Sequence, residues 1–77
     1  MMTADQRRAL TLLASDQHGA TEALMLAHCF KRETLAGLVQ AGLATVVTET
    51  MRAGAATIKV ERYRVTDDGR DALAAEG

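Results

Sequence analysis

The chain has 77 residues, with nine basic and ten acidic side chains and a formal charge of −1. A chain this short forms one small domain, and we assign residues 1–77 to it. Its single cysteine excludes an internal disulfide and is typical of a reducing compartment. No stretch approaches the roughly 20 apolar residues of a membrane span, so we expect a soluble cytoplasmic protein without membrane contact. Because a core of this size rarely supplies more than roughly 3–5 kcal/mol, we also expect a homodimer.

The charges are unevenly distributed along the chain. Residues 31–64 carry six Lys or Arg against three Glu, whereas residues 65–77 carry one Arg against four acidic side chains. The middle of the chain is therefore basic and the end acidic. Such an asymmetry can mark a binding face, although it can also arise by chance in a small domain.

A capping pattern predicts where the first helix begins. Thr3 and Gln6 have the spacing of a capping box, in which each side chain bonds the other residue's amide. Apolar residues at helical spacing follow over 9–13, and they predict a buried stripe. Residues 15–19 are turn formers that end in glycine, so the helix should stop there.

Two further helices are predicted. Thr21 is a candidate cap for a helix that runs to about residue 28. Its expected core residues are Leu24, Ala27 and one of Met25 or Leu26. After a break at residues 29–30, a third helix should span 31–41 and end at Gly42. Its expected core residues are Leu35, Leu38 and Val39.

The period of the pattern then changes to that of strands. Residues 44–49 and 58–65 predict an antiparallel hairpin, joined by a flexible connection over 50–57. The apolar positions change parity between Val60 and Tyr63, which predicts a bulge near residues 61–62. Thr66 can then cap a final helix over 67–75.

Two motifs carry a resemblance that covers nearly the whole chain. Residues 38–43 match the pattern L-x-x-x-G-L, and residues 63–73 match Y-x-V-T-x-x-G-x-x-x-L. In this order the chain resembles the winged helix-turn-helix family, as found in small bacterial regulators. The resemblance implies a mainly α, α+β domain with three helices, a two-stranded wing and a short C-terminal helix. It also implies that the protein binds double-stranded DNA as a transcriptional regulator or accessory factor, with helix 31–41 in the major groove and the wing 44–65 beside it.

By position, the resemblance assigns the DNA contacts. Arg32 could pair with guanine and Gln40 with adenine, while Lys31 would approach a phosphate and Arg52 would lie at the wing tip. The exposed face of helix 31–41 is expected to hold Arg32, Glu33, Ala36, Gly37 and Gln40. The full set of expected contacts is Lys31, Arg32, Thr34, Gln40, Arg52 and Arg62. For Lys59, Arg62 and Arg64 on the second wing strand, pairing with Glu49 competes with phosphate contact.

The remaining candidates point to no catalysis or cofactor. Cys29 stands at a turn position where the family often has glycine, so the backbone there is expected to be either strained or differently arranged. His28 and Cys29 offer too few ligands for zinc, and a helix-end histidine and a buried thiol explain them better. A redox role of Cys29 stays open. No nucleophile or phosphate-loop motif is present, so we expect no enzyme activity and no cofactor or metal. The alternative function is a protein–protein interaction module on the same scaffold.

Overall fold

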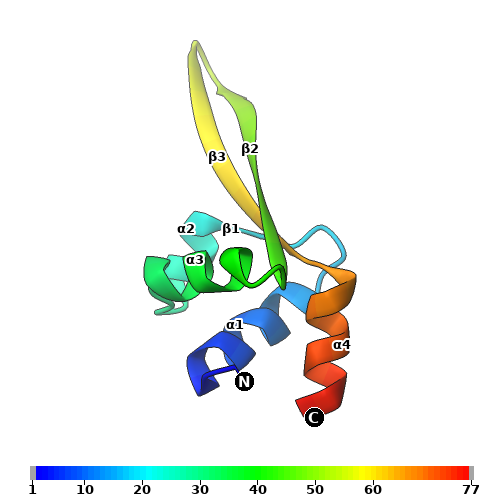
Figure 1. Ribbon diagram of the computed structural model, residues 1–77. Helices are drawn as coiled ribbons and strands as arrows, with labels where there is room; N and C mark the ends of the chain where they lie inside the picture. Colours follow the sequence, from blue (N-terminus) through cyan, green and yellow to red (C-terminus); the bar gives the residue numbers. More distant parts are fainter. Residues whose placement is uncertain (1, 77) are drawn as a thin grey trace.

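The computed structural model describes residues 2–76, which form a small α+β domain of four helices and a three-stranded antiparallel sheet (Figure 1). The elements in chain order are α1 (Ala4–Ala14), β1 (Ala20–Thr21), α2 (Glu22–Ala27), α3 (Arg32–Gln40), β2 (Ala44–Ala53), β3 (Ala56–Val65) and α4 (Asp67–Glu76). No helix within residues 2–76 is long and apolar enough to cross a membrane.

The sheet has one strand more than the sequence predicted. Its order is β1-β3-β2, and Ala20 and Thr21 of β1 pair with Tyr63 and Arg62 of β3. The predicted two-stranded hairpin is confirmed in β2 and β3, whereas the third strand, β1, was not predicted. A strand of two residues has no periodicity of its own, and β1 exists only because the chain passes along the edge of β3.

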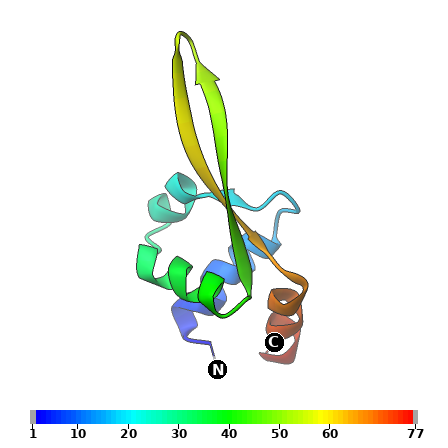
Figure 2. The same ribbon diagram turned by 45° about the horizontal axis from the view of Figure 1, so that its top comes forward.

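The core lies where the helices meet the base of the hairpin (Figure 2). Its largest fully buried side chains are Leu10, Leu13, Met25, Leu35 and Leu38. Burying one such side chain contributes roughly 1.5–3 kcal/mol. Leu24 and Ala27 were expected in this core, but both are exposed. The six-residue α2 is too short to bury more than one narrow stripe, and Met25 occupies it.

Threonine caps begin three of the helices, as the sequence predicted. Thr3 and Gln6 form the capping box, with two hydrogen bonds of 3.0 Å. The Thr21 hydroxyl accepts from the Leu24 amide at 3.2 Å. The Thr66 hydroxyl accepts from the Gly69 amide and donates to the Gly42 carbonyl. These bonds satisfy amides that a helix leaves unpaired at its first turn.

Helices α2 and α3 end in the same backbone motif. After α3, the Leu43 amide donates to the Leu38 carbonyl, and Gly42 adopts a left-handed φ of 76°. After α2, the Phe30 amide donates to the Met25 carbonyl. The left-handed position there is Cys29, with φ of 69°, so the predicted strain at this residue is confirmed. Its thiol is exposed, not buried as expected, because the left-handed turn directs the side chain to solvent.

Cys29→Gly should stabilise the domain by about 0.5–1 kcal/mol. A left-handed backbone costs a residue with a Cβ about 1–2 kcal/mol, and the greater freedom of glycine in the unfolded chain offsets about half of that. Urea unfolding measures the change. Cys29→Ala is the control, because it removes the thiol and keeps the Cβ. Equal stability of the two variants would contradict the prediction.

The hairpin is longer and more regular than predicted. Strands β2 and β3 pair without interruption from Ala44 and Val65 to Ala53 and Ala56. A two-residue turn closes it, with Gly54 at a φ of 66°, and glycine at this first position is typical of a type II′ turn. The predictions of a flexible connection over 50–57 and of a bulge near 61–62 were therefore wrong.

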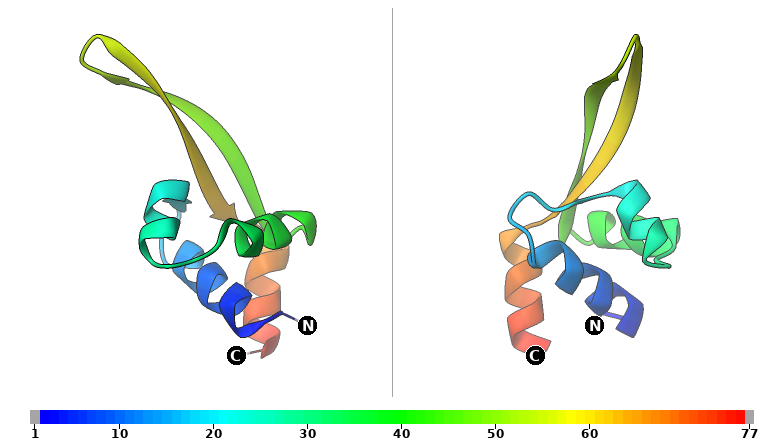
Figure 3. Two further views of the ribbon diagram at one scale, coloured as in Figure 1. Left: turned by 90° about the vertical axis from the view of Figure 1, so that its left-hand side faces the viewer. Right: turned by 180° about the vertical axis from the view of Figure 1, so that it is seen from behind.

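The parity change that favoured a bulge has another cause. Tyr63 lies at the base of the hairpin and is buried in the core, whereas Ile58 lies nearer the tip and is exposed. Apolar residues of opposite parity face opposite sides of the sheet. No bulge is needed, because only the base of the hairpin has a core to face. The hairpin projects well clear of the helices (Figure 3), and the longest dimension of the domain is 46 Å.

Candidate nucleic-acid interface

The start of α3 presents two basic side chains. Lys31 precedes the helix and Arg32 is its first residue, and both are exposed. Glu33, Ala36 and Gln40 continue the exposed face, as predicted, because Leu35 and Leu38 turn the opposite face into the core. These exposed residues thus lie where helical periodicity predicted them.

Two predicted residues of α3 are not on the open face. Gly37 is half-buried and faces α1, since a Cβ on it would lie 3.0 Å from Gln6 Nε2. Its assignment to the exposed face was therefore wrong, and the reason is the close approach of α1 to α3. Thr34 is also half-buried. The accessible predicted contacts on this helix are Lys31, Arg32 and Gln40.

Arg32 is held in place by Glu22. The Arg32 Nε donates to Glu22 Oε1 at 3.2 Å, and the Tyr63 hydroxyl donates to Glu22 Oε2 at 3.4 Å. Burial raises the pKa of the Tyr63 phenol, and the charges of Glu22 and Glu61 raise it further. The phenol therefore remains a donor at neutral pH. One carboxylate joins α2, α3 and β3, and the Arg32 side chain stays 74% exposed.

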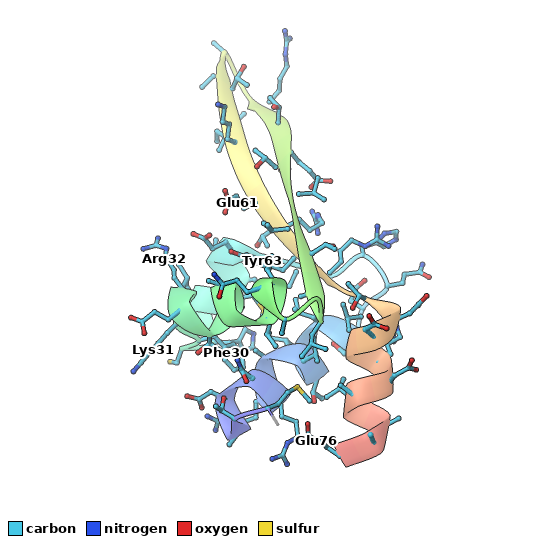
Figure 4. All side chains as sticks on the ribbon, in the orientation of Figure 1. Phe30, Lys31, Arg32, Glu61, Tyr63 and Glu76 are labelled. Atoms are coloured by element: carbon cyan, nitrogen blue, oxygen red, sulfur yellow. The ribbon has the colours of Figure 1, made fainter. Side chains whose placement is uncertain are left out.

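A groove separates α2 from the free edge of β3, and Arg32 lies beside it. Arg32 and Lys59 supply its cations, and Glu22 and Glu61 supply its carboxylates. Figure 4 shows Lys31 and Arg32 at the left margin of the molecule, with Glu61 above them on the hairpin. Apolar side chains complete the lining: Ala23, Leu26, Ile58 and Val60. With two cationic and two acidic side chains in its lining, the groove carries no net formal charge.

The register of the hairpin places Lys59 and Arg52 on one face. Lys59 pairs with Thr50, Arg52 pairs with Thr57, and Tyr63 pairs with Val46. Alternate residues of a strand share a face, so Lys59 and Arg52 lie on the face of Tyr63, the one that contacts α2. Lys59 was not among the six expected contacts, yet it lines the same groove as Arg32. The position of Lys59 on this face follows only from the register of the two strands.

Arg62 belongs to the opposite face. It follows Glu61 and precedes Tyr63, so its side chain points away from α2 and α3. Arg62 Nε donates to Glu49 Oε1 at 2.8 Å, which confirms the predicted pairing with Glu49. A second groove there is lined by His18, Val47, Glu49, Arg62 and Arg64. The structure therefore does not bring Arg62 together with the basic residues of α3.

No group of three or more metal-ligating side chains occurs within residues 2–76. The comparisons with protein-family models, with curated proteins and with solved structures found no match. A function must therefore be inferred from the chemistry of the exposed side chains. Guanidinium and ammonium groups bind phosphate oxygens, and a guanidinium can also bind the two acceptors of guanine.

Proposed function

We propose that this protein binds double-stranded DNA through α3 and the hairpin, in a winged helix-turn-helix arrangement, as a transcriptional regulator or accessory factor. One observation carries the proposal. The exposed basic start of α3, with Lys31 and Arg32, adjoins the hairpin face that carries Lys59 and Arg52. The order α2, α3, hairpin also supports it, because a helix pair followed by a wing is a known way to dock on a duplex.

In this proposal α3 enters the major groove. Glu22 engages Arg32 only through Nε, which leaves the two Nη groups to reach a guanine or a phosphate. Gln40 lies eight residues further along the helix, about 12 Å away, and could contact a second base. Lys59 would meet the neighbouring backbone, and Arg52 could do so as well wherever the β2 edge is free. Each phosphate neutralised adds about 0.9 to the salt slope of the affinity.

The test is a fluorescence-anisotropy titration of a labelled mixed-sequence duplex at about 50 mM and about 200 mM salt. We expect binding at low salt that collapses at high salt. The double variant K31A/R32A should bind about 10–100-fold more weakly. Its salt slope should fall by about 1–2.

The matched control is R7A/R70A, which removes the same charge from exposed positions on α1 and α4. We expect this control to retain most of the affinity. Equal weakening by the two double variants would contradict an interface at α3. A duplex that stays unbound at low salt would remove DNA binding altogether.

A protein-interaction module is the second candidate function. The observation that favours it is the set of exposed large apolar side chains, four of which lie on the hairpin: Val46, Val47, Met51 and Ile58. Apolar side chains gathered on a projecting element are typical of a surface for another protein.

A further inference from the structure

Within residues 2–76, the outer edge of β2 has no partner strand. The order β1-β3-β2 places β2 at the edge of the sheet over ten residues. Proteins usually shield such an edge with proline, bulges, several charges or a covering segment. This strand contains no proline and no bulge, and its two charged residues are Glu49 and Arg52. Glu49 is already neutralised by Arg62.

The free backbone groups of this edge follow from the hairpin turn. In a two-residue hairpin, the residues that flank the turn exchange both hydrogen bonds. Ala53 and Ala56 are these residues, so every second residue from Ala53 bonds to β3. The residues between them direct their N–H and C=O groups outward: Val46, Thr48, Thr50 and Arg52. These groups form a template for a further antiparallel strand.

We propose that two copies of this chain associate edge to edge through antiparallel β2 strands, with the two-fold axis at Thr50. The product is a six-stranded sheet of order β1-β3-β2-β2-β3-β1, in which the β2 strands of the two copies lie at the centre. Thr50 then faces itself, and Thr48 faces Arg52 of the second copy. Because the strands run in opposite directions, the two helical bodies lie at opposite ends. The long projection of the hairpin leaves room for this arrangement (Figure 3).

Charge complementarity selects this register. Arg52 and Glu61 make no ion pair with any residue of the described range 2–76. Thr48 pairs with Glu61 within one copy, so Arg52 of the second copy enters the same row, on the same face as Glu61. The two-fold axis creates two such arrangements of Arg52 from one copy and Glu61 from the other. An axis at Glu49 or at Arg52 would instead place like charges opposite each other.

The apolar side chains of the other face gain partners in the same register. Met51 and Ile58 pair across the hairpin and are 51% and 48% exposed. In the pair of copies, the two Met51 residues are diagonal neighbours across the axis, so both Met51–Ile58 pairs form one cluster. Val47, 50% exposed, faces Ala53 of the second copy. In this dimer Arg52 serves the protein interface, and the DNA surface consists of Lys31, Arg32 and Lys59.

Sedimentation equilibrium without DNA tests the proposal, over protein concentrations from about 1 μM to about 1 mM. We expect a concentration-dependent dimer. Thr50→Pro removes an outward N–H and should give a folded monomer. Thr57→Pro makes the same change on the open edge of β3 and should still dimerise. A wild-type protein that is monomeric throughout would overturn the proposal, and so would a Thr50→Pro variant that dimerises like the wild type.

A charge exchange provides the second test and does not depend on proline tolerance. Arg52→Glu places an acidic group in the same cross-strand row as Glu61 of the second copy, on the other side of Thr48, and should raise the dimer dissociation constant about tenfold or more. The double variant R52E/E61R restores opposite charges and should recover the wild-type constant. If the double variant dimerises no better than Arg52→Glu alone, the proposed register is wrong.

Discussion

Gly19→Ala should destabilise the domain by about 2–5 kcal/mol. The backbone of Gly19 is left-handed, with φ of 75°, which costs an alanine about 1–2 kcal/mol. Its Cβ would also overlap the carbonyl oxygen of Tyr63 and lie 2.8 Å from Arg64 Cγ. The carbonyl belongs to β3, so relief requires a backbone shift that costs about 1–3 kcal/mol. At about 4–8 °C per kcal/mol, thermal denaturation should show a clearly lower Tm.

Gly42→Ala separates the two causes. Gly42 has a φ of 76°, and a Cβ there would have no neighbour within 4 Å among residues 2–76. This variant therefore measures the left-handed conformation alone, with an expected loss of about 1 kcal/mol. If Gly19→Ala proves no more harmful than Gly42→Ala, the close approach between residue 19 and β3 does not exist in solution.

Gly69→Ala should also destabilise, although its place in a helix predicts the reverse. Alanine in a helix interior is favoured over glycine by about 1 kcal/mol. Here the new Cβ would overlap the Leu43 carbonyl oxygen and lie 2.8 Å from Val65 Cγ2. Relief moves α4 away from the base of the hairpin, so we expect a net loss of about 1–3 kcal/mol. Urea unfolding monitored by circular dichroism measures it.

Gly37→Ala is the matched control in α3. The nearest atom to its new Cβ is Gln6 Nε2, at the end of a flexible side chain. We expect this variant to keep or exceed wild-type stability, because helix propensity then dominates. The same substitution should thus have opposite effects in the two helices. A stabilising Gly69→Ala would show that α4 does not pack as closely as the structure has it.

Features that depend on residues close in the chain were predictable from the sequence. The capping pair Thr3 and Gln6 and the helix end at Gly42 each involve partners within a few residues. The strand β1 was not predictable, because Ala20 pairs with Tyr63, far along the chain. The hairpin length was missed because Gly54-Ala55 lacks the Asn-Gly or Asp-Gly signal of a tight turn.

In the candidate site, too, the local features were predictable from the sequence and the long-range features were not. Helical periodicity predicted that Arg32 and Gln40 are exposed, since it requires only the positions of Leu35 and Leu38. The separation of Arg62 from α3 depends on the register of β3, which the expected bulge would have shifted. The link from Arg32 to Glu22 joins two helices, and no local pattern reveals it.

Thr66 joins the two ends of the β2-β3 hairpin, which is called the arm below. Its hydroxyl donates to the Gly42 carbonyl at 2.7 Å, and its amide donates to the Leu43 carbonyl at 3.0 Å. The entry and exit of the arm are thereby fastened together at the body. The tip can then vary without disturbing this fastening. Removing two cross-strand pairs would shorten the arm by about 6.6 Å and preserve both its faces and the position of the turn in the ladder. The reach of the arm is thus a property that evolution or design can tune separately from the fold that carries it.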